Sequence, residues 1–268
     1  MTTVAPARTV TTRSQFADVL RAEFCKFRSV RSTFWTLIAA VVFNVMLAAL
    51  AAIFIPGHLN AQDKATTDPI RLSLAGIHLS QIAFGVLGTL VITSEYGTGM
   101  IRATFAAVPQ RRLVLAAKAI VFAAAALIVG IASSFAAYYT FGAFVSGDSL
   151  RSTVGDPGVL RAIIGGGLYL VVLGLLGLGL GAIIRSSAGT IATLFGLLFV
   201  PSVLVSLLPH SWQTAAGPYV PMQAGSQIFV AAQHDPNSLG AWTGFGVFCL
   251  YATAALAIGF ALIKHCDA

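Results

Sequence analysis

The sequence has very little charge. Only 9% of its 268 residues are Asp, Glu, Lys or Arg, whereas 57% are hydrophobic. A soluble chain of this length needs many more charged side chains to cover its core. The composition therefore excludes an ordinary soluble protein and predicts an integral membrane protein.

Cysteine is scarce as well. The three cysteines, Cys25, Cys249 and Cys266, form no CxxC pair and no even-numbered framework. The sequence therefore predicts neither disulfides nor a metal site.

Motifs of catalysis and nucleotide binding are absent. The chain contains no HExxH, GxSxG or GxGxxG pattern. Its four lysines are followed by Phe, Ala, Ala and His, so no GxxxxGK[ST] loop is present to hold phosphates. We expect no enzyme activity, no cofactor bound to this chain and no ATP hydrolysis by that route.

Long apolar runs are what the sequence has instead. A helix needs about 20 residues to cross a hydrocarbon core of about 30 Å. Six runs are long enough: Phe34–Ile55, Leu72–Thr93, Ile120–Phe144, Ala162–Ile184, Ala188–Leu208 and Ala241–Ile263. They are too long and too unalternating for barrel strands. The sequence predicts an all-α integral membrane protein with six transmembrane helices in residues 34–268.

The basic residues predict the orientation of these spans. If both termini are cytoplasmic, 12 of the 16 Lys and Arg residues fall in cytoplasmic segments and four fall outside. This bias follows the positive-inside rule. We expect a multi-pass protein of the cell membrane with both termini in the cytoplasm. The net charge of +7 does not indicate nucleic-acid binding, because the basic residues flank apolar spans.

The segment before the first span shows helical periodicity. Residues 1–11 read as a disordered tail, and residues 12–33 carry one apolar stripe that includes Val19, Phe24 and Phe27. Such a helix lies in the membrane interface and contacts lipid. Glu23 falls within the stripe, which leaves two interpretations: a snorkelling side chain or a contact with a protein partner.

The connector between the second and third spans is unusually polar. Gly97 and Gly99 allow a sharp turn. Ile101, Phe105 and Val108 then share one face, which predicts a short amphipathic helix near 97–108, lying along the membrane surface. A solvated loop that only satisfies the positive-inside rule remains the alternative.

This connector resembles a known family. The matching residues are Glu95-Tyr96-Gly97-Thr98-Gly99, then Arg102, Pro109-Gln110-Arg111-Arg112 and Lys118. They are similar to the connector in permease subunits of ABC-2-type ABC transporters. The six spans, the helix before them and the long outer segment before the last span also fit that family.

The resemblance implies a function. The connector would be a coupling helix that docks on a separate ATPase subunit, with ATP and Mg²⁺ bound there. Two permease copies or paralogues would form the pathway for a hydrophobic or amphipathic substrate: a drug, lipid, glycan or peptide. The implied coupling residues are Glu95, Gly97, Thr98, Gly99, Arg102, Pro109, Arg111, Arg112 and Lys118. The alternative is a self-contained channel or secondary carrier.

Three further features bear on function. Gly177 and Gly181 form GxxxG, which predicts close helix packing either within the chain or at a dimer seam. His78 is the one candidate for a proton site within a span, although a packing role is commoner. Segment 209–240 lacks Lys and Arg. It suits a re-entrant or interfacial element at the outer mouth, with Trp212, Tyr219 and Phe229 as its aromatic residues.

Overall fold

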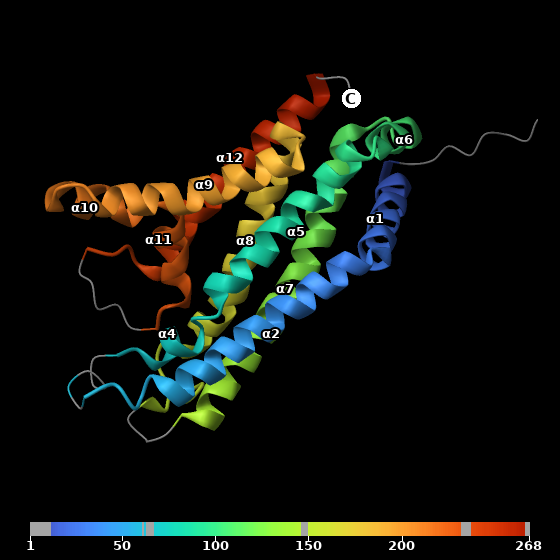
Figure 1. Ribbon diagram of the computed structural model, residues 1–268. Coiled ribbons are helices and arrows are strands. Elements are labelled where there is room, and N and C mark those ends of the chain that lie inside the picture. The colour runs from blue at the N-terminus through green and yellow to red at the C-terminus, as the bar shows by residue number, and fades with distance from the viewer. Residues whose placement is uncertain (1–11, 61, 63–66, 146–149, 232–236, 266–268) are drawn as a thin grey trace, which may run out of the picture.

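The regular elements of the chain are helices throughout the part that the structure describes. This computed structural model describes residues 12–60, 62, 67–145, 150–231 and 237–265 (Figure 1). Six helices in these ranges are long and apolar enough to cross a membrane. They are α2 (Arg31–Phe54), α5 (Ile77–Gly97), α7 (Arg111–Phe144), α8 (Val159–Ile184), α9 (Ser187–Ser206) and α12 (Ala241–His265). The predicted six-span helical architecture is confirmed to that extent, while the predicted tail 1–11 lies outside the described residues.

Shorter helices connect the long ones. They are α1 (Thr12–Ser29), α4 (Pro69–Ser73), α6 (Met100–Ala107), α10 (His210–Ala216), η2 (Gly217–Tyr219), α11 (Pro221–Ser226) and η3 (Gln227–Phe229). The segment predicted as an interfacial helix over residues 12–33 is helical from Thr12 to Ser29, and Val30 adopts an extended conformation before α2 begins. Its position in the membrane interface stays a prediction.

Two span starts differ from the prediction by five residues or more. The second span starts at Ile77 instead of Leu72, because Asp68 and Pro69 begin the separate helix α4. The Asp68 carboxylate accepts a hydrogen bond from the Ile70 N–H at 2.9 Å, a capping contact that starts a helix. The third span starts at Arg111, well before the predicted Ile120, so α7 also includes Lys118.

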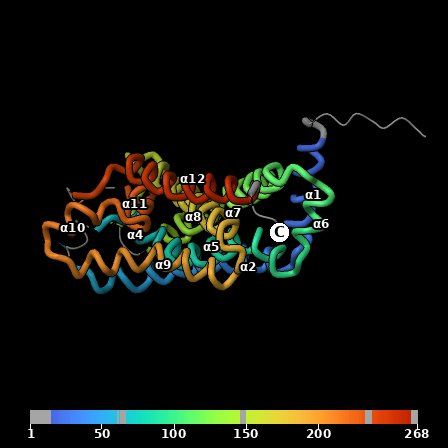
Figure 2. The backbone as a smooth tube through the Cα atoms, turned by 90° about the horizontal axis from the view of Figure 1, so that it is seen from above, coloured from blue at the N-terminus to red at the C-terminus, as the bar shows by residue number. Residues whose placement is uncertain are grey.

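Helix α8 is the centre of the bundle. It packs against α5, α7 and α12, and is the most buried of the six long helices (Figure 2). Gly177 and Gly181 face α5: an added Cβ would lie 2.8 Å from the Gly85 carbonyl oxygen and 2.8 Å from Ile92 Cγ2, respectively. Such distances are too short for a side chain, so these glycines allow the two helices to approach closely. The helix that they approach is α5 of the same chain, as the alternative of packing within the chain predicts.

Other helices leave apolar side chains exposed on the outside of the bundle. Examples are Trp35 on α2, Ile128 on α7, Leu207 just after α9 and Leu250 on α12, each more than 60% exposed. Exposed apolar side chains on helices that can span a membrane suit contact with lipid chains.

The short helices lie in different parts of the bundle. Helix α6 and the end of α12 lie at one end, and α1 lies beside α6 there (Figure 1). Helices α4 and α10 lie away from that end. The functional residues predicted for the connector therefore gather at the α6 end of the molecule.

Candidate functional site

The connector turns sharply and then forms a short helix. Helix α5 runs through Glu95 to Gly97 instead of ending near Thr93, and Thr98 caps it. Gly99 follows with φ of 72°, in the left-handed region that favours glycine. The predicted helix near 97–108 is confirmed as α6, Met100–Ala107, and Pro109 lies just beyond its end.

One face of α6 packs into the chain's own core. Ile101 is 3% exposed and Phe105 is 8% exposed, and both belong to the main hydrophobic cluster. The Arg111 guanidinium carbon lies 5.2 Å from the centroid of the Phe105 ring, a cation–π contact between the start of α7 and α6. The predicted apolar face is therefore present, and it holds α6 against the bundle.

Four charged side chains meet beneath this connector. We call Glu23, Lys26, Glu95 and Lys118 the charge quartet. Lys118 Nζ lies 2.8 Å from Glu23 Oε2 and 2.7 Å from Glu95 Oε1. Lys26 Nζ lies 2.8 Å from Glu23 Oε1 and 3.0 Å from Glu95 Oε1. The quartet thus joins α1, α5 and α7 through four salt bridges.

The quartet is largely buried and carries no net charge. Glu23, Glu95 and Lys118 are 5%, 6% and 3% exposed, whereas the Lys26 side chain is 37% exposed. Removing charges from water costs several kcal/mol per ion, and only partners in good geometry offset that cost. Each charge is therefore tolerated because the other three are present.

Lys26 stays protonated in this setting. Its burial alone would lower the pKa of the ammonium group. Hydrogen bonds and Coulomb attraction to Glu23 and Glu95 outweigh burial and raise the pKa above its ordinary value. The ammonium group of Lys26 therefore keeps its charge throughout the physiological pH range.

The quartet also touches α6. Thr104 of α6 donates a long hydrogen bond of 3.5 Å from Oγ1 to Glu95 Oε2. The next residue of α5, Tyr96, lies under the guanidinium of Arg185, with Arg185 Cζ 5.5 Å from the ring centroid. Arg185 follows the end of α8. The connector, three spans and α1 are thus linked within one small region.

The role of Glu23 differs from both interpretations of the sequence. Glu23 neither snorkels to water nor awaits a protein partner, because it pairs within the chain with Lys26 and Lys118. A carboxylate on the apolar stripe of the N-terminal segment was the available signal; its partner Lys118, just before the predicted third span, proves to lie within α7. Each charge would be costly to bury alone, and the ion pair between Glu23 and Lys118 accounts for the burial of both.

The predicted coupling residues are buried, half-buried or exposed. Glu95 and Lys118 are buried together in the quartet. Arg111 is half-buried over Phe105. The others lie exposed on the connector: Gly97, Thr98, Gly99, Arg102, Pro109 and Arg112. Only this exposed group is available to contact another protein in this structure.

The three aromatic residues predicted for the outer segment differ in exposure. Phe229 is 3% exposed, and its ring centroid lies 5.3 Å from that of Tyr169 and 5.9 Å from that of His78. Trp212 and Tyr219 are 62% and 53% exposed. His78 therefore makes an aromatic packing contact, and Phe229 anchors the segment to the bundle.

No family model matches the chain, and no curated protein matches it. In the described ranges, no three His, Cys, Asp or Glu side chains are grouped as metal ligands. The resemblance of the connector to ABC-2-type permeases therefore stays a prediction.

Proposed function

We propose that this chain is the permease subunit of an ATP-driven ABC exporter in the cell membrane. Both termini would lie in the cytoplasm, and a second permease copy or paralogue would complete the pathway. ATP and Mg²⁺ would bind to a separate ATPase subunit. The observation that carries this proposal is the two-sided construction of α6, whose inner face is fixed to the bundle while its outer face is exposed.

The exposed face of α6 suits close contact with a protein. It carries Arg102 together with Ala103, Ala106 and Ala107, all exposed. Alanines let a partner surface approach the helix backbone, and Arg102 can pair with a carboxylate through two parallel hydrogen bonds. This face therefore fits a cleft with acidic groups in the ATPase subunit.

The inner contacts of α6 supply a path for movement. A displacement of α6 acts on α5 through Thr104 and Glu95, and on α7 through Phe105 and Arg111. Through the quartet it also acts on α1. Rigid, buried contacts transmit small displacements because packed elements do not deform continuously. ATP-driven closure of the partner would in this way move α5 and α7 against the rest of the bundle.

The alternative, a self-contained channel or carrier, has less support. The Asn44 amide donates to Ser133 Oγ at 2.9 Å, and Gln81 Oε1 accepts from Tyr169 OH at 2.6 Å. Both side chains are buried between helices and do not line an open polar path through this chain. A pathway between two permease copies, covered by apolar surface, agrees better with a hydrophobic or amphipathic substrate.

Site-specific crosslinking tests the proposal. A photo-crosslinking amino acid at Ala106, on the exposed face of α6, should capture a P-loop ATPase in the native membrane. The same group at Ile128, which is 70% exposed on the middle of α7, should capture lipid and no ATPase. Equal ATPase capture at both positions, or none at Ala106, would refute the docking assignment.

A further inference from the structure

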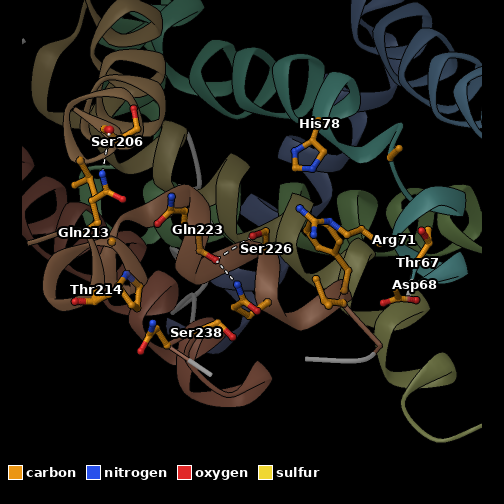
Figure 3. A pocket seen from close by; sticks show the side chains of 18 of the residues that line it. Thr67, Asp68, Arg71, His78, Ser206, Gln213, Thr214, Gln223, Ser226 and Ser238 are labelled. Carbon is orange, nitrogen blue, oxygen red and sulfur yellow. Dashed lines mark hydrogen bonds between the residues drawn. The ribbon is translucent and has the colours of Figure 1, made fainter. Parts of the chain in front are cut away.

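A large cavity lies near the start of α5 and the end of α9, apart from the connector. It measures about 1140 Å³ and is bounded by α4 and the start of α5 on one side and by the end of α9 and α10 on another. Helix α11 and η3 form its floor (Figure 3). A volume of this order exceeds what one drug-sized ligand needs. The coupling residues do not line it, so it requires an explanation of its own.

The floor of the cavity is held in a fixed position. Asp68 Oδ2 accepts a hydrogen bond from the Ala231 N–H at 3.0 Å, and Arg161 donates to the Val230 and Ala231 carbonyls at 2.9 and 3.1 Å. Phe229 packs edge-on against His78. The end of η3 is thus tied to α4, α5 and α8, which preorganises the cavity wall.

Two charged residues, Asp68 and Arg71, line the cavity besides its histidines. Both Asp68 oxygens accept backbone N–H groups, from Ile70 and Ala231. Arg71, in contrast, forms no hydrogen bond or salt bridge within the described part of the chain. Its guanidinium therefore has all of its donors available to a ligand.

Further donors line the same cavity. Figure 3 shows the side chains of Arg71 and His78 directed into the cavity, whose lining also includes Gln223 and Ser226. The side-chain amide of Gln223 makes no hydrogen bond with the described residues. An arginine fork in a cavity that also holds imidazole and amide groups matches the oxygens of a phosphate or carboxylate.

Part of the cavity wall is apolar. Leu72 and Ala75 contribute from the α4 side, Val205 from α9, and Pro218 and Phe229 from the outer segment. A ligand with an anionic head and a hydrocarbon chain would place its charge at Arg71 and its chain along these residues. Such a chain would leave water for apolar surface, which stabilises the bound state.

We propose that this cavity is a binding site for amphipathic organic anions, with Arg71 as the main contact for the anionic head group. The same chemistry occurs in anionic membrane lipids and in soluble amphiphiles. This proposal is tested separately from the ATPase coupling proposed above, because ligand binding is measured on the purified chain without the ATPase.

Calorimetry with decyl phosphate tests the site. The full-length chain is placed in phosphatidylcholine nanodiscs, and the signal of empty discs is subtracted. We expect saturable binding that weakens at least about tenfold in Arg71→Gln, because a charge-assisted hydrogen bond is lost. Arg71→Lys should retain part of the affinity, and Gln223→Glu should weaken binding by placing a like charge beside the ligand.

The controls separate charge recognition from nonspecific partitioning. Arg151→Gln removes an exposed cation that does not line the cavity, and it should bind like the wild type. Decyl maltoside has the same chain without the charge and should bind at least about tenfold more weakly. Equal affinity of the wild type and Arg71→Gln, or equal affinity for the two amphiphiles, would overturn the proposal.

A second lipid composition distinguishes the sources of the ligand. In nanodiscs with phosphatidylglycerol, a lipid occupant would compete, so the affinity ratio between wild type and Arg71→Gln would shrink. Surface charge of the bilayer alone would lower both affinities and leave that ratio unchanged. A smaller ratio supports an anion site filled by lipid, and an unchanged ratio supports one filled from solution.

Discussion

Lys118→Met should lower the free energy of unfolding by about 3–5 kcal/mol, the usual cost of breaking a buried ion pair. Lys118 is 3% exposed and contacts Glu23 and Glu95 at 2.8 and 2.7 Å. Its removal leaves two buried carboxylates with Lys26 as their one remaining cation in the quartet. The loss is measured by unfolding the purified protein in mixed micelles with increasing sodium dodecyl sulfate.

A second substitution separates lost charge balance from lost packing. Lys118→Met combined with Glu95→Gln leaves Glu23 and Lys26 as a balanced pair. The double variant should be more stable than the sum of the single effects predicts, by about 0.5–3 kcal/mol. Arg28→Gln, at an exposed position of α1, should change stability by about 0.5 kcal/mol or less. Strictly additive effects of the two quartet substitutions would show that the charges do not act as a unit.

Arg102→Glu should reduce the amount of ATPase recovered with the chain at least about tenfold. The Arg102 side chain is exposed on α6 and belongs neither to the quartet nor to the hydrophobic core. Reversal of its charge would set a carboxylate against the acidic groups that we expect in the partner, and like charges at an interface cost several kcal/mol. The measurement compares ATPase per permease after affinity purification from the native membrane.

The matched control is Arg21→Glu, an exposed arginine of α1 outside the connector. It should leave ATPase recovery unchanged, and both variants should insert and unfold like the wild type. Equal loss of ATPase in the two variants would assign the effect to net charge and not to a specific contact. Full recovery with Arg102→Glu would remove Arg102 from the interface.

Local patterns were sufficient to predict most of the fold. The spans follow from the length of their apolar runs, and α6 follows from the spacing of Ile101, Phe105 and Val108. The close packing at Gly177 follows from GxxxG, but its partner does not. A small residue indicates that something approaches closely without specifying which helix does so.

The quartet could not be predicted because its members are far apart in the chain. Glu23 and Lys118 are 95 residues apart, and Lys26 and Glu95 are 69 apart. The rule that buried charges are paired could have raised the question for Glu23, but no local pattern identifies the partner. The resemblance to ABC-2-type permeases grouped Glu95 and Lys118 with the docking residues, whereas their burial indicates a role in holding the connector to the bundle.

The start of α5 is a second feature that the sequence did not predict correctly. Asp68 and Pro69 are recognisable helix-start signals just before the apolar run, but run length alone placed the span start at Leu72, which lies inside α4, and not at Ile77. Asp68 also fixes the outer segment through Ala231, a contact over 163 residues. The cavity therefore depends on chain segments whose proximity only the folded structure reveals.

Copurification tests most directly whether this chain works with a separate ATPase. The wild-type chain is purified from its native membrane in mild detergent, and the proteins that accompany it are identified and quantified. A P-loop ATPase in stoichiometric amount is the predicted result. A chain that purifies without any ATPase, and that still moves solute across vesicle membranes without ATP, would contradict the exporter proposal and favour the channel or carrier.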